Sequence, residues 1–388
     1  MVFTRFVFLA LASLLLLTDN SQAQERDFSG GEVAFDQDHY ADFLSSSLKT
    51  TRNYSIGIRV TLFGYEMDND KLGLPYVRRQ IDEYLIKPYL KSIGFRQEKE
   101  LHDLTFIANG FMPLHISDET EIFQLRHGNE YLLSADRPFS SFTGFRSTKR
   151  WEGNKIFATS ARKMDFAVIS TFSFGFAGFG LAESMQEFFH SNDSFGTSRP
   201  VPNLWQRDSS KDYPTGQVFR AGFPLFMYTI SAEAVVWKPI KTFQIQLRPD
   251  FNIGYYTNFG FGFDFGKVMK GEKFIDNLGY TDTNNASILS VANDYFAYSL
   301  VAGGTARFVL YNAHLNGLYG LSSGHYIDFE NTRHVVLEGY LGAKVQILNL
   351  VEFMASVTAR TPEIKSTNEQ ELHFWATLSA KFILNSYN

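Results

Sequence analysis

Polar and ionisable residues from three separate parts of the chain could form a single site. Gln37 and Asp38 lie near the end of one predicted strand, Ser55 begins the next, and His190 follows a later strand. Counting strands places all three segments at the same end of the predicted sheet, so carboxylate, amide, hydroxyl and imidazole groups converge there. Side chains of these types bind cations and transfer protons. This end of the sheet is therefore the candidate site for chemistry.

A serine-hydrolase motif also occurs, but without the elements that it needs. Gly320-Leu321-Ser322-Ser323-Gly324 matches the pattern G-x-S-x-G, and His314 and His325 are nearby. Such a nucleophile works from a strand-to-helix turn in a parallel α/β sheet, and no part of the chain predicts such a sheet. We interpret this segment as an outer loop.

The elements that must position the candidate residues are strands of alternating hydrophobicity. Between Leu372 and Leu384 all even positions are apolar, whereas His, Thr, Ser and Lys occupy odd ones. In Thr242–Tyr256 the second face carries Gln, Arg, Asp and Asn, which a soluble sandwich core could not bury unpaired but a wet lumen can hold. The sequence therefore predicts an all-β fold, a transmembrane antiparallel up-and-down β-barrel of about twelve strands. The predicted strands are Glu32–Tyr40, Ser55–Glu66, Leu104–Met112, Phe139–Thr148, Phe166–Gly178, Phe226–Lys238, Thr242–Tyr256, Tyr256–Gly266, Tyr298–Tyr311, Val336–Leu348, Val351–Arg360 and Leu372–Leu384.

Export and composition favour the bacterial outer membrane. An early Arg5, an apolar run over Phe6–Leu17 and small residues up to Ala23 predict a cleaved signal peptide over residues 1–23. Of the 388 residues, 388 − 23 = 365 remain for one barrel domain over 24–388. Aromatic residues make up 16% of the chain, and no second apolar run approaches the roughly 18 residues that a spanning helix needs. Dispersed aromatic residues in an exported chain are typical of an integral outer-membrane barrel.

Charge and cysteine content exclude several classes of function. The chain has 36 basic and 41 acidic residues, a net charge of −5, so no basic field invites nucleic acid. An anionic ligand would have to be held by local clusters, for which the chain offers Arg126-His127, Arg137 and Lys149-Arg150; a solvated loop face is the simpler interpretation. The absence of cysteine excludes a disulfide scaffold and a thiolate site.

One segment departs from the strand pattern. Over Leu72–Phe95, apolar residues Val77, Ile81, Tyr84 and Leu85 recur at helical spacing. The spacing predicts a short amphipathic helix, interrupted by Pro88, inserted in the first periplasmic turn.

The candidate residues lie within motifs that resemble a known family. Phe35-Asp36-Gln37-Asp38-His39-Tyr40 followed by Arg52-Asn53-Tyr54-Ser55-Ile56-Gly57 resembles the opening of the LpxR-type lipid A 3′-O-deacylases. The likeness continues in order through Asp136-Arg137-Pro138-Phe139, Gln186-Glu187-Phe188-Phe189-His190 and the closing strands, over nearly the whole mature chain. Gln37 stands where the family has Asn, and Ser55 where it has Thr.

The resemblance implies a monomeric, calcium-dependent hydrolase that removes the 3′-linked acyloxyacyl group from lipid A of lipopolysaccharide in the outer leaflet. His190 matches the catalytic histidine and would act as a general base on the attacking water. Asp38 matches the aspartate that would hold Ca²⁺ or orient the base, with Gln37 and Ser55 beside the metal and the carbonyl. A Ca²⁺ ion with oxygen ligands is suited to polarising an ester carbonyl.

A non-catalytic outer-membrane barrel of the same fold, for lipid binding or transport, is the alternative. Two features favour it: Gln37 replaces the family's Asn, and the segment Leu114–Ala135 contains no lysine where the family uses one. Arg126 is the nearest cationic substitute. A calcium requirement would separate the two hypotheses.

Overall fold

The computed structural model describes fifteen stretches of the chain. They are residues 30–37, 56–63, 73–93, 95–111, 123–127, 130–134, 140–156, 163–178, 218–219, 222–240, 243–268, 296–318, 326–347, 351–365 and 372–383. The predicted signal peptide, residues 1–23, lies outside them. Within these stretches, no helix is both long enough and apolar enough to cross a membrane.

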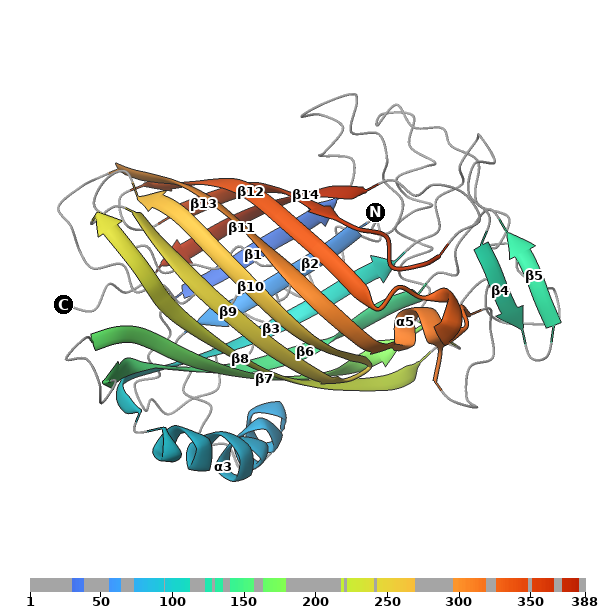
Figure 1. Ribbon diagram of the computed structural model, residues 1–388, viewed down its shortest axis with the longest axis horizontal. Helices are drawn as coiled ribbons and strands as arrows, with labels where there is room; N and C mark the ends of the chain where they lie inside the picture. Colours follow the sequence, from blue (N-terminus) through green and yellow to red (C-terminus); the bar gives the residue numbers. More distant parts are fainter. Residues whose placement is uncertain are drawn as a thin grey trace, which may run out of the picture.

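Twelve strands close into one antiparallel barrel (Figure 1), which confirms the predicted fold class. Consecutive barrel strands pair with each other, and β14 pairs with β1 to complete the wall. The barrel strands are β1 (Gly30–Gln37), β2 (Ile56–Phe63), β3 (Arg96–Phe111), β6 (Ser140–Ile156), β7 (Lys163–Ala177), β8 (Phe223–Ile240), β9 (Phe243–Gly254), β10 (Tyr256–Val268), β11 (Phe296–Asn312), β12 (Val335–Ile347), β13 (Val351–Arg360) and β14 (His373–Ile383).

The two ends of the barrel differ in their connections. We name the end at which β1 finishes the outer end, because it carries the longest connection, residues 178–222, and the two-stranded sheet of β4 (Phe123–His127) and β5 (Glu130–Ser134). Strands β1 and β14 have their free ends at the opposite end. Two strand pairs are joined closely, β8 to β9 by residues 241–242 and β9 to β10 by Tyr255 alone.

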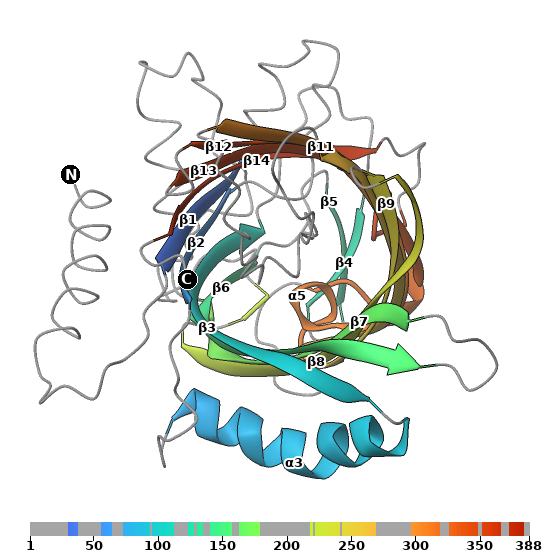
Figure 2. The ribbon, with the colours of Figure 1, turned by 90° about the vertical axis from the view of Figure 1, so that its left-hand side faces the viewer.

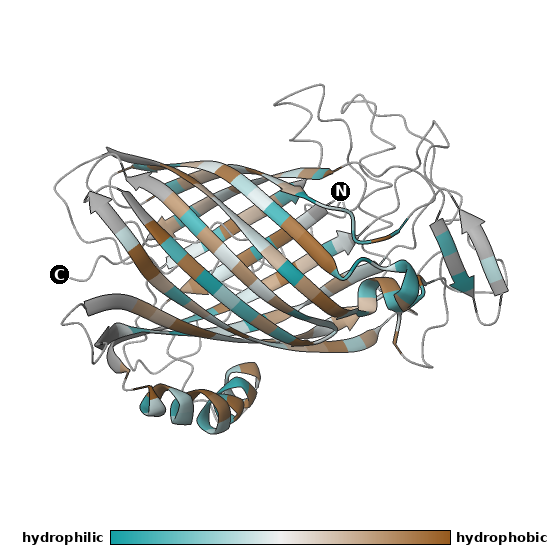
Figure 3. Cartoon of the chain, in the orientation of Figure 1, coloured by the Kyte–Doolittle hydropathy of each residue, from teal (hydrophilic) through white to brown (hydrophobic). Residues whose placement is uncertain are grey.

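Alternation along each strand separates an apolar outer face from a polar lumen. On β10 the phenylalanines at 259, 261, 263 and 265 are all exposed, whereas Gly260, Gly262 and Asp264 between them are buried. The same alternation of brown and teal runs along the other strands (Figure 3). The Gly-Phe repeat leaves room in the lumen, because a Cβ on Gly262 would meet Thr305 and Arg248. A strand with bulky residues outside and small ones inside lets a long charged side chain from a neighbouring strand lie over it: Arg248 on β9 reaches the Thr305 hydroxyl on β11 at 3.3 Å.

Ion pairs between strands fill this lumen. Arg150 on β6 contacts Glu233 on β8 at 2.6 Å, and Lys344 on β12 contacts Glu352 on β13 at 2.9 Å. Arg307 on β11 lies 3.4 Å from Glu338. All of these side chains are almost fully buried, and buried charges are retained only when paired. The luminal charges predicted from the alternation are therefore structural partners of one another.

Helix α3 (Leu74–Ser92) packs across the outside of the barrel wall (Figures 1 and 2). Its side chains Arg78 and Asp82 form an ion pair at 2.5 Å that is sealed against the wall. Arg78 donates to the Ser147 hydroxyl on β6 at 3.2 Å, and the Tyr228 hydroxyl on β8 donates to Asp82 at 2.7 Å. Burial raises the pKa of the Asp82 carboxyl, and the guanidinium of Arg78 opposes that shift. Beside the pair, an apolar cluster joins the helix to β6 and β7: Ile86, Leu90, Trp151 and Val168.

The structure corrects one expectation about this helix: Pro88 lies inside one continuous helix and does not interrupt it. The apolar stripe seen in the sequence faces away from the barrel, since Val77, Tyr84 and Leu85 are exposed. The face on the wall is mixed: Arg78 and Asp82 meet polar groups there, and Ile86 and Leu90 belong to the apolar cluster.

Smaller elements at the outer end were not predicted. The β4–β5 hairpin lies in the segment 114–135, interpreted from sequence only as a loop. Helix α5 (Ala313–Asn316) directly continues β11, and the 3₁₀ helix η3 (Phe329–Asn331) precedes β12. These pieces are too short for a periodic pattern to reveal them.

We predict that Gly303→Ala destabilises the barrel by about 1–3 kcal/mol through overpacking. A Cβ at Gly303 would lie 2.5 Å from the Tyr340 hydroxyl and 2.6 Å from the backbone oxygen of Phe263. At Gly339, on the outer face of the next strand, the nearest atom would be 3.8 Å away. Urea unfolding in detergent, followed by tryptophan fluorescence, should give a lower midpoint for Gly303→Ala and an unchanged one for Gly339→Ala. Equal midpoints for the two variants would contradict the packing argument.

We predict that Asp82→Ala releases α3 from the wall, because it leaves Arg78 as an unpaired buried charge, at a cost of about 3–5 kcal/mol. Glu83→Ala is the matched control: the neighbouring Glu83–Lys87 pair is exposed, and such pairs contribute at most about 0.5 kcal/mol. Limited trypsin digestion of the folded barrel should cut within α3 rapidly in Asp82→Ala and slowly in Glu83→Ala and the wild type. Resistance of Asp82→Ala would show that the ion pair does not hold the helix.

Candidate functional site

The strand ends that carry the predicted site residues meet at the outer end. Antiparallel order places the end of β1, the start of β2 and the end of β7 there. Gln37 is the last residue of β1, and its backbone pairs with Ile56 on β2 and Ala376 on β14. Asp38, Ser55 and His190 lie outside the described residues, as does the side chain of Gln37. Their roles therefore stay predictions.

The inward face predicted for β2 is confirmed. Arg59 lines a luminal cavity, and the Thr61 hydroxyl lies 3.0 Å from that of Thr105 on β3. Ser55, at an odd position like these two, follows the same alternation in the sequence.

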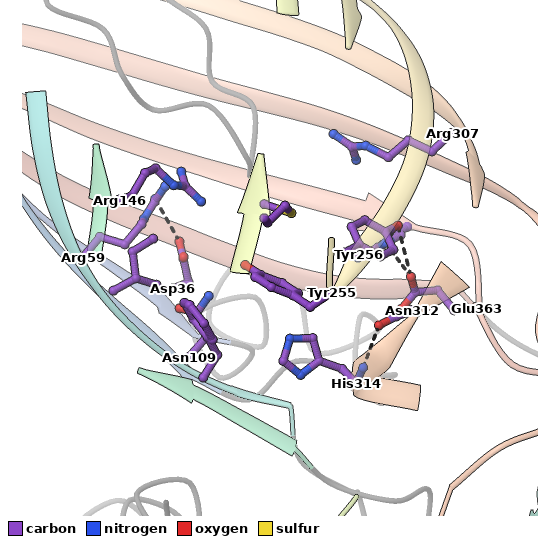
Figure 4. A pocket seen from close by; sticks show the side chains of 14 residues that line it. Asp36, Arg59, Asn109, Arg146, Tyr255, Tyr256, Arg307, Asn312, His314 and Glu363 are labelled. Carbon is purple, nitrogen blue, oxygen red and sulfur yellow. Dashed lines mark hydrogen bonds and ion pairs between the residues drawn. The ribbon is translucent and has the colours of Figure 1, made fainter. Parts of the chain in front are cut away.

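A cavity that is partly open to solvent occupies the outer part of the lumen (Figure 4). Asp36 and Arg59 line one side, with a carboxylate-to-guanidinium distance of 3.6 Å, and Arg146 from β6 lies next to them. Asp36 immediately precedes the predicted site residues Gln37 and Asp38. The cavity thus lies directly below the rim where those residues are expected.

A second arginine group lines the other side of the cavity. Arg360 donates to Glu363 at 2.7 Å and to the Tyr256 hydroxyl at 3.0 Å, and Arg307 is close by. The lining therefore contains four arginines and two carboxylates. Arg59, Arg307 and Arg360 are each ion-paired, with Asp36, Glu338 and Glu363 respectively, so their charges are balanced within the protein.

His314 closes the cavity from helix α5. Its Nδ1 lies 2.7 Å from the Ser140 hydroxyl, and its ring meets Phe142 and Tyr255 edge-on. Burial raises the pKa of the Tyr255 hydroxyl, while Arg146 opposes the shift, so Tyr255 remains a hydrogen-bond donor. Aromatic rings on one wall and arginines on the other suit an amphipathic molecule with a charged group.

The Lys149-Arg150 pair proposed from sequence does not act as a cluster. Lys149 and Arg150 are neighbours on β6 and so face opposite sides of the wall: Lys149 lies over the Trp151 ring outside, whereas Arg150 is paired with Glu233 in the lumen. The interpretation of this pair as a solvated loop face was also wrong, since both side chains are buried.

Arg126, the proposed substitute for the family's lysine, lies on β4 and contacts the segment between α5 and β12. It contacts Asp328 at 3.2 Å, and its backbone forms a β-bridge with Tyr326. The hydrogen bond to Asp328 raises the pKa of the Arg126 guanidinium. Arg126 thus fastens β4 to the segment that follows α5, while Arg137 lies outside the described residues.

The described residues offer no ready-made metal site. Within the stretches that the structure describes, no three histidine or acidic side chains come together in a way that could hold an ion. Asp36, two residues before Asp38 in the sequence, is paired with Arg59 and so does not fit a cation ligand. The fit of Ca²⁺ therefore depends on Asp38.

Sequence reasoning missed the role of His314 and Tyr255. His314 appeared only as a neighbour of the G-x-S-x-G motif, yet its hydrogen-bond partner is Ser140, 174 positions earlier. Tyr255 was predicted to lie inside the strand Thr242–Tyr256, whereas it lies between β9 and β10. A period-two pattern reports which face a residue occupies, but not which distant strand end approaches it.

Comparison with known proteins supports the fold assignment. No protein-family model matches the chain, and no curated protein matches it. Among solved structures, LpxR from Salmonella typhimurium is similar over 92% of this chain and 100% of its own, with 13% identity and a TM-score of 0.56. An outer-membrane channel from Pseudomonas putida F1 is matched over 94% of this chain and 100% of its own, with 7% identity and a TM-score of 0.39. The translocator domain of the autotransporter NalP from Neisseria meningitidis is matched over 98% of this chain and 95% of its own, with 9% identity and a TM-score of 0.36. At these identities the likeness to LpxR shows a shared fold, that of an outer-membrane β-barrel, and the two weaker matches add nothing to it.

We predict that His314→Ala destabilises the outer end of the barrel by about 3 kcal/mol, since it removes a buried ring packed on three aromatic residues. Ser140→Ala should cost only about 1 kcal/mol, the value of one hydrogen bond. His334→Ala serves as the control: its ring is only half-buried and lies 3.1 Å from the carbonyl oxygen of Val309, so its loss should cost about 1 kcal/mol, the value of one hydrogen bond. Thermal unfolding in detergent measures all three. If the His314→Ala midpoint equals that of His334→Ala, the His314 ring does not stabilise the outer end by packing.

Proposed function

We propose that this protein is an outer-membrane hydrolase that cleaves the 3′-linked acyloxyacyl ester of lipid A. The observation that carries the proposal is the whole-length likeness of fold to LpxR, together with family-like motifs that occur in the same order along this chain. The position of the ends of β1 and β7 and the start of β2 at the outer end supports it, because the motifs lie next to these strand ends in the sequence.

In the proposed reaction, His190 takes a proton from a water molecule, which attacks the ester carbonyl. The bond between the carbonyl carbon and the ester oxygen then breaks: the acyl group leaves as a carboxylic acid, and lipid A keeps a hydroxyl group that receives the proton from His190. Asp38 either holds Ca²⁺ or orients His190, and Gln37 and Ser55 contribute polar groups beside the carbonyl. Bound Ca²⁺ would supply Lewis-acid polarisation of the carbonyl oxygen. Gln37 is one methylene longer than the family's Asn, so its amide reaches further from the backbone of β1.

The cavity below the rim supports a lipid A substrate. Arg59 and Arg146 suit an anionic group, and the aromatic wall around His314 suits an apolar one. Lipid A combines both chemistries in one molecule. In this proposal the ester is cleaved at the rim, and the cavity below it binds another part of the substrate.

The packing of the lumen argues against the transport alternative. Arg150, Arg307 and Lys344 are each paired with an acidic side chain of another strand, and all are nearly inaccessible. A solute passing through would have to separate buried ion pairs, each at a cost of several kcal/mol. A barrel that acts on lipid at its outer rim has no need of an open lumen.

We predict that His190→Ala abolishes deacylation of lipid A, with a fall in rate of about 10²–10⁴-fold expected for loss of a general base. Mass spectrometry of lipid A from cells that produce the wild type should show loss of one acyloxyacyl group, and chelation of calcium during incubation of the purified barrel should prevent that loss. His334→Ala provides a histidine control at the same end of the barrel.

One result would overturn the proposed activity, and another would overturn only the role of His190. Unchanged lipid A in cells with a confirmed folded wild-type barrel would favour the non-catalytic alternative. Deacylation that persists in His190→Ala would retain the activity but reject the assigned base.

A further inference from the structure

Helix α3 has three distinct faces, and the barrel accounts for only one of them. Pro75, Arg78, Asp82, Ile86 and Leu90 are buried against the wall. The second face, next to the buried one around the helix axis, contains Arg79, Glu83, Lys87 and Lys91. The third contains Val77, Ile81, Tyr84 and Leu85, of which Val77 is 41%, Tyr84 79% and Leu85 54% exposed.

The patch of wall beneath the Arg78–Asp82 half of α3 lacks the apolar side chains found elsewhere, whereas beneath the second half of the helix Trp151 and Val168 are apolar. On β6 and β7, the outward positions Ser147, Lys149 and Ser170 are polar, and all three are buried. On the adjacent strands, the positions in register with Ser147 are Leu104 on β3 and, one strand further, Leu62 on β2. The apolar outer surface of the barrel is therefore interrupted here, and bare serine and lysine facing hydrocarbon would be costly.

Towards the outer end, the same strands regain the apolar surface. Phe145 on β6, Phe174 on β7 and Phe226 on β8 are exposed on the outward face. The polar patch thus lies on the side of this surface nearer the end where β1 begins. Helix α3 covers the patch with the Arg78–Asp82 pair, whose polar partners Ser147 and Tyr228 belong to the wall.

We propose that α3 restores the lipid-facing surface that β6–β8 lack, with its stripe of Val77, Ile81, Tyr84 and Leu85 inserted into the periplasmic leaflet of the bilayer. The occupant is phospholipid, because the stripe continues the belt of exposed apolar side chains on the same strands. The second face, with Arg79, Lys87 and Lys91, meets the headgroups, in the arrangement of an interfacial amphipathic helix. Only a helix with a polar face for the wall and an apolar face for lipid can bridge the two.

The test uses the absence of cysteine from the chain. Spin labels are attached to single cysteines at Leu85 on the stripe, Gln80 on the polar side, and Leu341, an outward residue of β12 that is 65% exposed. The barrels are reconstituted in vesicles of phosphatidylethanolamine and phosphatidylglycerol. Collision rates with apolar oxygen and with a water-soluble nickel chelate then report whether each site lies in lipid. All three positions are on the surface, and the gel mobility shift of folded barrels confirms folding.

The ratio of oxygen to nickel collisions should be several-fold higher at Leu85 than at Gln80, and close to that at Leu341. The inference rests on the proposed membrane barrel, so Leu341 separates the two possible failures. If the Leu341 label lies in lipid but the Leu85 label has the same collision ratio as the Gln80 label, the proposed role of α3 is overturned and the membrane barrel is not. A Leu341 label in water would overturn the membrane barrel as well, and a Leu85 label shielded from both reagents would indicate a protein neighbour and reject lipid as the occupant.

Discussion

The pairing of β1 with β14 is the constraint on which the rest of the structure depends. Eight residue pairs, from Gly30 with Ile383 to Gln37 with Ala376, join the two ends of the sheet. In hydrocarbon an unpaired backbone amide or carbonyl has no water to bind, so an open edge would cost several kcal/mol for each group. Closure removes the edges, and it also fixes which side chains face each other across the lumen.

The luminal charges depend on the register of neighbouring strands. Arg307 on β11 meets Glu338 on β12, and Arg150 on β6 meets Glu233 two strands away. Each pair joins different strands, so each forms only when those strands are in the correct register. Glycines on β10 and β11 provide space for another pair: Gly262 lies against Arg248 and Gly303 against Asp264, and these two charged groups are 3.8 Å apart. The same alternation that presents phenylalanine to lipid thus creates the volume that the ion pairs occupy.

Alternation made the barrel predictable because its period of two depends only on the local chain and on a two-sided environment. Twelve strands and the inward position of Arg59 follow from it. The docked face of α3 does not, since the choice depends on Ser147 and Tyr228, which are far away in sequence. The Lys149-Arg150 pair was misjudged for a related reason: adjacency in sequence means opposite faces on a strand.

For the candidate site, the topology was enough to infer that the strand ends lie at the same end of the barrel. The hydrogen bond between His314 and Ser140 could not be inferred, because no local sequence signal links α5 to β6.

Unequal connections also set an order of assembly. Strands β8, β9 and β10 are joined by two residues and then by one, so their pairing closes the smallest loops and carries the least entropic cost. The seam between β1 and β14 unites residues such as Phe35 and Leu378, which are 378 − 35 = 343 positions apart, and it can form only after the last strand is available. We expect the wall to grow outward from this central meander and to seal last at its two ends. A chain shortened within β14 would then retain most of its hairpins while leaving β1 and β13 as open edges, a state that exposes it to misassembly and proteolysis and keeps incomplete chains out of the mature population.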